Sequence, residues 1–97
     1  MKFQIKLTQS AEEDLGHFKV YEMRVIIDAI KGYLGEDADV ENKRRKKLTV
    51  NPLAPWELRV GSYRIFYDID EEYLVKIVAI GYKEHNELLI RGRRVEL

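Results

Sequence analysis

Residues 56–70, WELRVGSYRIFYDID, constrain the fold more than any other segment. Apolar and polar residues largely alternate on both sides of Gly61 and Ser62, which predicts two strands joined by a two-residue turn. A type II′ turn fits, because its first central residue needs a positive φ. Since side chains alternate across a strand, two sets should point to opposite faces: Tyr63, Ile65 and Tyr67 on one, and Arg64, Phe66 and Asp68 on the other.

Two arginines, Arg59 and Arg64, lie just outside the turn, one on each strand. Together they could present two guanidinium groups to a phosphate-rich ligand, because the planar fork of arginine matches phosphate geometry. Exposed arginines are also common where they only keep a sheet face hydrated. The hairpin alone leaves both interpretations open.

The composition predicts a single soluble domain. A chain of 97 residues can build one modest core but not two, so we expect residues 1–97 to form one domain. The absence of cysteine excludes a disulfide framework. No signal-like segment follows Met1, and no apolar run reaches the length of a membrane span. We therefore expect a cytoplasmic protein with no membrane partner.

The charges are unevenly distributed along the chain. The formal net charge is zero, which argues against a nucleic-acid partner if taken alone. Residues 1–41, however, carry 5 Lys/Arg and 9 Asp/Glu, whereas residues 42–97 carry 12 and 8. A basic second half can still attract phosphates.

Five consecutive cations form the most basic segment, and they are Lys43, Arg44, Arg45, Lys46 and Lys47. We expect a loop or an exposed short helix here, because apolar residues are scarce. The run predicts an RNA-binding segment that engages backbone phosphates by counterion release. The alternative is a hydrated loop neutralised by the acidic residues 36–41 beside it.

The first half of the chain predicts a strand followed by two helices. Residues 3–7 alternate as a half-buried strand does, and Thr8 or Ser10 can cap a short helix that Gly16 weakens. Apolar residues at helical spacing then predict a second helix over residues 20–34, and Gly35 should end it.

The second half predicts strands only. Pro52 and Pro55 disfavour regular structure before Trp56. Strands should follow at residues 56–60, 63–69 and 73–80. The expected fold class is therefore α+β, in the order β-α-α-β-β-β, with an antiparallel sheet packed against an N-terminal helical hairpin.

Two polar side chains after the last predicted strand are candidate catalysts. Histidine titrates near neutral pH, so His85 suits a general acid or base, and Lys83 could stabilise developing phosphorane charge. A lone surface histidine often has no such role. Because the sequence has two histidines and no cysteine, and lacks a glycine-rich phosphate loop, we expect neither a metal nor a cofactor.

The segment LRVGSYRIFY, with Asn51 and Pro52 before it and the strand ending at Ile80 and Gly81 after it, resembles the RelE/ParE superfamily. These are toxins of bacterial or archaeal type II toxin-antitoxin pairs. The resemblance implies the fold predicted above and a cognate antitoxin that wraps the toxin. It also implies one of two activities. RelE-like members cleave messenger RNA on the ribosome without a metal, whereas ParE-like members inhibit DNA gyrase.

The resemblance also assigns site residues. Arg64 matches the arginine that contacts the scissile phosphate in the nucleases, while Arg59 and Lys83 match basic positions. The sequence departs from the studied nuclease in two places. Pro55 and Glu57 stand where that nuclease has lysines, and Leu89 stands where it has a C-terminal tyrosine. An acid-base pair then requires His85 or Tyr82 as a substitute.

We therefore expect a toxin that cleaves mRNA on the ribosome through Arg64, Arg59, Lys83 and His85. The alternative is a non-catalytic inhibitor directed at a protein such as gyrase, or a degenerate toxin that acts only together with its antitoxin.

Overall fold

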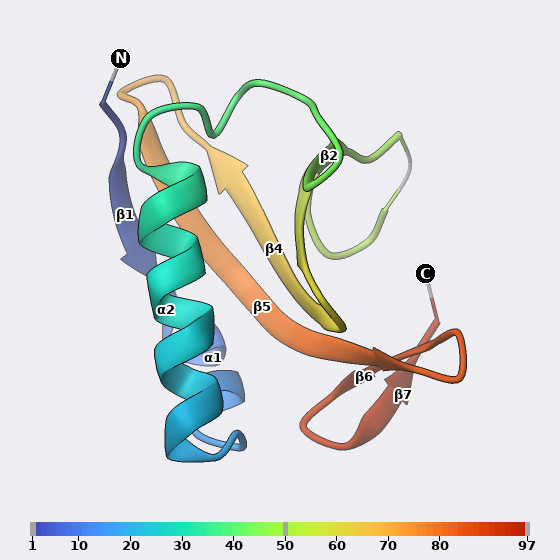
Figure 1. Cartoon of the computed structure of the whole chain (residues 1–97). Helices are drawn as coiled ribbons and strands as arrows, with labels where there is room; N and C mark the ends of the chain where they lie inside the picture. The colour runs from blue at the N-terminus through green and yellow to red at the C-terminus, as the bar shows by residue number, and fades with distance from the viewer. Residues whose placement is uncertain (1, 50, 97) are drawn as a thin grey trace.

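Two helices pack against one face of a strongly bent sheet in the computed structural model, which describes residues 2–49 and 51–96 (Figure 1). The predicted α+β fold with a helical hairpin on a sheet is confirmed. Among the described residues the order is β1 (Gln4–Leu7), α1 (Gln9–Leu15), α2 (Val20–Leu34), β2 (Arg45–Lys47), β3 (Trp56–Val60), β4 (Tyr63–Ile69), β5 (Leu74–Glu84), β6 (Glu87–Ile90) and β7 (Arg93–Val95). No helix in this described part is long and apolar enough to cross a membrane.

The long strand β5 organises the sheet. Strands β2 to β7 pair in sequence order, each antiparallel to the next, while β1 pairs with β5 in parallel. Tyr82 of β5 pairs with both Tyr63 of β4 and Leu89 of β6, so β6 lies on the edge of β5 away from β4. The first half of this same edge pairs with β1, up to Leu7 opposite Ile77.

Asp14 of α1 fills the gap that β1 and β6 leave along this edge. One of its carboxylate oxygens accepts the backbone N–H of Ile80 at 3.0 Å, and the other accepts Arg91 Nε at 2.6 Å. Asp14 is 2% exposed. A buried carboxylate is tolerated when it is paired and hydrogen-bonded, so this contact fixes α1 and the β6–β7 turn to the centre of the sheet.

The predicted ends of the helices are largely confirmed. Thr8 rather than Ser10 caps α1, because its Oγ1 accepts the backbone N–H of Ala11 at 3.1 Å. The predicted range of α2 is the observed one, and Gly35 follows its last residue. At the other end of α2, the Glu22 side chain accepts the backbone N–H of Lys19 at 3.1 Å, which satisfies one of the free donors of the first turn.

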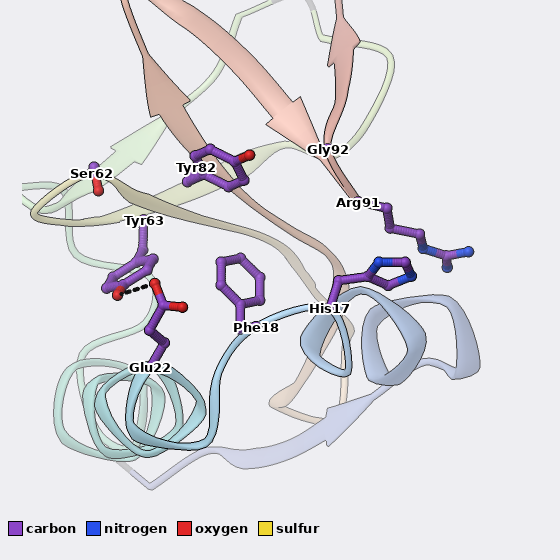
Figure 2. Close-up of a pocket in the computed structure, with 8 residues that line it drawn as sticks. All are labelled: His17, Phe18, Glu22, Ser62, Tyr63, Tyr82, Arg91 and Gly92. Atoms are coloured by element: carbon purple, nitrogen blue, oxygen red, sulfur yellow. Dashed lines mark hydrogen bonds between the residues drawn. The ribbon is translucent and has the colours of Figure 1, made fainter.

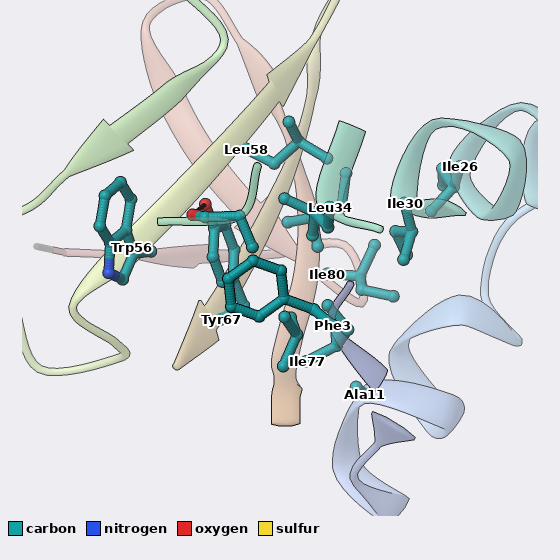
Figure 3. Close-up of a cluster of buried hydrophobic side chains, with 13 residues drawn as sticks. Phe3, Ala11, Ile26, Ile30, Leu34, Trp56, Leu58, Tyr67, Ile77 and Ile80 are labelled. Atoms are coloured by element: carbon teal, nitrogen blue, oxygen red, sulfur yellow. Dashed lines mark hydrogen bonds between the residues drawn. The ribbon is translucent and has the colours of Figure 1, made fainter. Parts of the chain in front are cut away.

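The main core lies between the helices and the sheet (Figure 3). Aliphatic side chains of α2 meet β-sheet side chains that alternate along each strand. Fully or almost fully buried members are Ile26, Ile30, Leu34, Leu58, Ile65, Tyr67, Val75, Ile77 and Ile80. The hydroxyl of Tyr67 donates to the carbonyl oxygen of Ala38 at 2.7 Å, so this buried polar group is satisfied. Burial raises the pKa of Tyr67.

A smaller apolar cluster covers the opposite face of the sheet. Phe66 is its largest buried member, and it packs with Ala54, Ala79 and Leu88. The partly buried residues around it come from the segment before β3, from β5 and from the β6–β7 hairpin, and they are Leu48, Leu53, Val78, Ile90 and Val95. The predicted division of β4 is confirmed for Ile65 and Tyr67 on the helix side and for Phe66 on the other.

The prediction of a loop or short helix is wrong at residues 45–47, which form β2 beside β3. The side-chain oxygen of Asn42 accepts the backbone N–H groups of Arg44 and Arg45, both at 2.8 Å, and turns the chain into this strand. Such a short strand depends on its partner and carries little hydrophobic pattern of its own.

The C-terminal region also contains more strand than predicted. The strand predicted to end at residue 80 continues to Glu84, and β6 and β7 follow it. Two-residue turns make this possible, because His85 and Asn86 have φ of 52° and 66°, and Arg91 and Gly92 have φ of 54° and 76°. Two successive positive φ values are the signature of type I′ hairpin turns.

Candidate functional site

The sheet face that points away from the helices carries Asp68 and Lys76 farther from the β3–β4 turn and, nearer to that turn, a cluster of five charged side chains. They are Lys46, Glu57, Arg59, Arg64 and Lys83, and we refer to them as the arginine face. The strand register places Lys46 opposite Glu57, and Arg59 opposite Arg64. Directly opposed residues of antiparallel strands project to the same side. Lys83 follows Gly81, the partner of Arg64, by two residues and therefore lies on this side as well.

Glu57 and Arg59 form the tightest contact of the arginine face. The distance from Glu57 Oε1 to Arg59 Nε is 2.6 Å. The Glu57 side chain is 5% exposed and that of Arg59 is 46% exposed, so a buried carboxylate meets a guanidinium that reaches solvent. In the sequence, Glu57 stands out only as a departure from the nuclease pattern. Its spacing of two from Arg59 in a strand was the signal that would have placed both on one face.

Arg64 is partly immobilised but retains unused donors. Its Nη1 donates to the carbonyl oxygens of Gly61 at 2.7 Å and of Tyr63 at 2.9 Å. Its Nε is buried and has no hydrogen-bond partner among the described residues. Loss of hydration through burial lowers the pKa of the Arg64 guanidinium, Glu57 raises it, and the charge of Arg59 lowers it further.

The five cations of the predicted RNA-binding run do not form one surface. Arg45 is 7% exposed and donates to the carbonyl oxygens of Tyr33 and Val40, so it ties β2 to the end of α2. The Arg44 guanidinium lies over the Tyr33 ring, 4.8 Å from its centroid. These two arginines therefore have structural contacts that the sequence analysis missed.

The three lysines of the run are arranged differently. Lys46 lies on the arginine face, whereas Lys47 pairs with Trp56 and projects toward the helix side. Lys43 is exposed and precedes the strand. Of the five predicted cations, only Lys46 therefore joins Arg59 and Arg64.

The structure places His85 at the tip of the β5–β6 turn. Its side chain is 90% exposed, and its Nε2 lies 3.9 Å from a carboxylate oxygen of Glu84. The catalytic role predicted for His85 stays a prediction. Tyr82, the other substitute considered, packs on the helix side against Phe18. Within the arginine face itself, Glu57 carries the one carboxylate.

Lys83 lies at the edge of the arginine face toward the C-terminal hairpin. Its backbone N–H donates to the carbonyl oxygen of Ser62 at 2.7 Å, which joins β5 to the β3–β4 turn. Its side chain lines a shallow pocket of about 320 Å³ together with Arg94. The Arg94 guanidinium is paired with Glu87 and Glu96, so Lys83 is the cation of this pocket without an ion pair among the described residues.

Comparison with known proteins gives a family match and a fold match. Residues 5–87 match the family described as the ParE toxin of the type II toxin-antitoxin system parDE. No curated protein sequence matches the chain. The toxin-antitoxin complex RelBE2 of Mycobacterium tuberculosis contains a chain that is 21% identical, with a TM-score of 0.73 over 86% of this chain and 100% of that one.

The archaeal RelE-RelB complex of Pyrococcus horikoshii OT3 is a second structural neighbour. The matched chain is 17% identical, with a TM-score of 0.67 over 88% of this chain and 99% of that one. At these identities the two structures establish the shared fold.

Proposed function

Because this chain belongs to the ParE toxin family of type II toxin-antitoxin systems, within the RelE/ParE superfamily, we propose that it inhibits growth by cleaving messenger RNA at the arginine face. The single observation that carries the proposal is the contact between a carboxylate and a guanidinium at Glu57 and Arg59, with Arg64 directly opposite. Such a cluster holds a proton acceptor beside two phosphate-binding groups, which are the groups that RNA cleavage by its own 2′-hydroxyl needs.

Each group has a separate task in the proposed reaction. Glu57 accepts the proton of the 2′-hydroxyl while the 2′ oxygen attacks the adjacent phosphorus. The bond from phosphorus to the 5′ oxygen breaks, and Lys83 donates a proton to that leaving oxygen. Arg59 and Arg64 bind the non-bridging oxygens, where charge increases in the transition state. The products carry a 2′,3′-cyclic phosphate and a 5′-hydroxyl.

The proposal includes the ribosome as the place of cleavage. Lys46 extends the arginine face toward the edge of the sheet, and Lys43 adds an exposed cation near that edge. Phosphate contacts of this kind provide affinity without reading a sequence. They suit a substrate that the ribosome, rather than the toxin, positions.

The proposal also includes a cognate antitoxin. Family membership supports it, and both structural neighbours are complexes of a toxin with its antitoxin by description. The chain itself offers apolar side chains on the outer surface of α2, where Val20 and Tyr21 are each 64% exposed and Val25 is 44% exposed. An amphipathic helix of the partner would remove this area from water.

Cleavage of a defined mRNA on translating ribosomes tests the activity. The substitution Glu57→Gln preserves the shape of the side chain but removes the proton acceptor, so it should lower the cleavage rate by about 10²-fold or more. Glu71→Gln removes the same charge from an exposed turn and is the matched control. Cleavage by Glu57→Gln at the rate of Glu71→Gln would contradict the proposed role of Glu57.

Inhibition of DNA gyrase is the second candidate, and the ParE family match favours it. In that case the arginine face would contact a protein, and the carboxylate of Glu57 would serve only to hold Arg59. A DNA supercoiling assay distinguishes the two functions. If the protein stops gyrase from supercoiling DNA and leaves mRNA intact, gyrase inhibition replaces the nuclease proposal. If mRNA is cleaved and supercoiling by gyrase is unchanged, gyrase is excluded as the target.

A further inference from the structure

A cavity of about 390 Å³ opens on the helix side of the sheet, opposite the arginine face (Figure 2). Three regions of the sequence form its wall: the α1–α2 connection with the first turn of α2, the β3–β4 turn, and β5 together with the β6–β7 turn. The lining residues are His17, Phe18, Glu22, Ser62, Tyr63, Tyr82, Arg91 and Gly92. A volume of this size accommodates a large side chain or small ligand.

Three aromatic rings form one part of the wall. Tyr63 and Tyr82 are paired across β4 and β5. The Phe18 ring is 5.7 Å from Tyr63 and 6.0 Å from Tyr82 between centroids, with interplanar angles of 75° and 77°. Edge-to-face packing of this kind holds the rings in fixed orientations, and their faces carry negative charge density.

The Glu22 carboxylate lies beside these rings, as Figure 2 shows. It accepts the Tyr63 hydroxyl at 2.8 Å as well as the backbone N–H of Lys19. Burial, followed by the hydrogen bond to Glu22, raises the pKa of Tyr63 to about 12. The phenol therefore stays protonated over the physiological range and keeps donating to Glu22.

The charges in and beside the cavity are negative in total. Arg91 reaches it from the β6–β7 turn, but its guanidinium is paired with Asp14 at 2.6 Å and with Glu13 at 3.1 Å. Those three groups carry one net negative charge, and Glu22 adds another. Figure 2 shows the Arg91 guanidinium directed away from the rings, so it does not occupy the space beside Glu22.

We propose that this cavity binds the guanidinium of an arginine side chain presented by a partner polypeptide. A planar cation can stack on the faces of aromatic rings and donate to a carboxylate at the same time. An anionic ligand would meet Glu22, and a purely apolar one would leave that carboxylate without hydration. The site lies on the other side of the sheet from the proposed RNA site and does not depend on RNA cleavage.

Titration of the isotope-labelled protein with N-acetyl-arginine methylamide, followed by NMR, tests the proposal. We expect saturable chemical-shift changes at Phe18, Tyr63 and Tyr82. N-acetyl-norleucine methylamide has a similar chain without the charge and should leave these signals unchanged. The variant Glu22→Gln still accepts the Tyr63 hydroxyl but lacks the charge, so the arginine probe should bind it about tenfold more weakly or worse.

Two further variants keep the test decisive. Glu71→Gln removes an equal charge on an exposed turn and should bind the arginine probe as the unaltered protein does. Phe18→Leu keeps Glu22 but removes one ring face, and should weaken binding as well. Equal binding of the norleucine probe, unchanged binding by both Glu22→Gln and Phe18→Leu, or shifts confined to the arginine face would each overturn the proposal.

Discussion

Tyr63 and Arg64 are consecutive residues, yet they belong to two chemically opposite faces of the same sheet. Tyr63 turns toward the helices, where aromatic rings and the Glu22 carboxylate line a cavity. Arg64 turns away from them and belongs to the arginine face, a cluster of four cations and one carboxylate. Strand alternation lets one hairpin contribute to two different surfaces, because consecutive side chains point to opposite sides of the sheet.

The two faces also explain how a chain of zero net charge can present a basic surface. The acidic first half of the sequence supplies Glu13, Asp14 and Glu22 to the cavity side. The basic second half supplies the cations of the arginine face. Opposite charges are therefore separated by the thickness of the sheet, and the local potential rather than the net charge governs which ligand each face attracts.

The largest expected effect is on the free energy of unfolding, which should depend on the helix side of the sheet and not on the arginine face. Leu58 lies between Glu57 and Arg59 in sequence but is fully buried on the helix side. Leu58→Ala should lower the free energy of unfolding by about 3 kcal/mol, because it leaves a cavity in the main core. Lys83→Ala on the arginine face should change it by less than about 0.5 kcal/mol. Urea unfolding measures both, and similar values for the two variants would contradict the assignment of the faces.

The second prediction concerns toxicity. Arg64→Ala removes a phosphate-binding group and should lower RNA cleavage by about 10²-fold, so that cells expressing it grow. Glu22→Gln alters the other face and should remain toxic. Colony counts after induction, at matched protein levels, provide the measurement. If Glu22→Gln abolished toxicity as Arg64→Ala does, the two faces would not act independently.

Sequence patterns predicted the elements whose signals are local. The range of α2 followed from apolar spacing and from Gly35, and the β3–β4 hairpin followed from alternation around Gly61, whose φ is 57° as the predicted turn requires. These signals work because each one reflects contacts within a few residues. The paired Arg59 and Arg64 were predictable for the same reason.

The parts that sequence patterns missed depend on contacts between distant residues. Asp14 meets Arg91 across 77 positions, and nothing in either neighbourhood marks the pair. Arg45 looks like any other member of a basic run until its carbonyl partners at Tyr33 and Val40 are known. Glu57 is the exception, because strand alternation places it on the same face as Arg59. The resemblance to the nuclease pattern did not indicate a role for it, since that pattern has a lysine at this position.

The third prediction uses the titration of Tyr63. Its pKa is raised from the ordinary value of 10.0 to about 12, so folding favours the protonated phenol. The resulting stability is fully present below pH 10 and is lost as the pH rises through about 12. In a titration followed by ultraviolet absorbance, the Tyr63→Phe variant should show one phenol fewer near pH 12 than the unaltered protein. Loss of a phenol that titrates near pH 10 would mean that Glu22 and burial do not control this group.

The smallest expected effect compares two neighbouring lysines of β2. Lys46 lies opposite Glu57 on the arginine face, whereas Lys47 lies opposite Trp56 on the other side. Each phosphate contact adds about 0.9 to the slope of log affinity against log salt for a duplex and about 0.7 for a single strand. Lys46→Ala should therefore reduce the slope for single-stranded RNA by about 0.7, while Lys47→Ala should leave it unchanged.

Fluorescence anisotropy over a series of salt concentrations measures these slopes, and the two variants control for each other because they remove the same charge from adjacent positions. A contact made by Lys46 alone would place the RNA on the side of the sheet that holds Glu57, Arg59 and Arg64. Equal slopes for both variants would instead mean that the β2 lysines attract RNA from a distance and that the RNA does not bind to one particular face of the sheet. The RNA would then have no geometric relation to the proposed proton acceptor, and the nuclease proposal would lose its structural support.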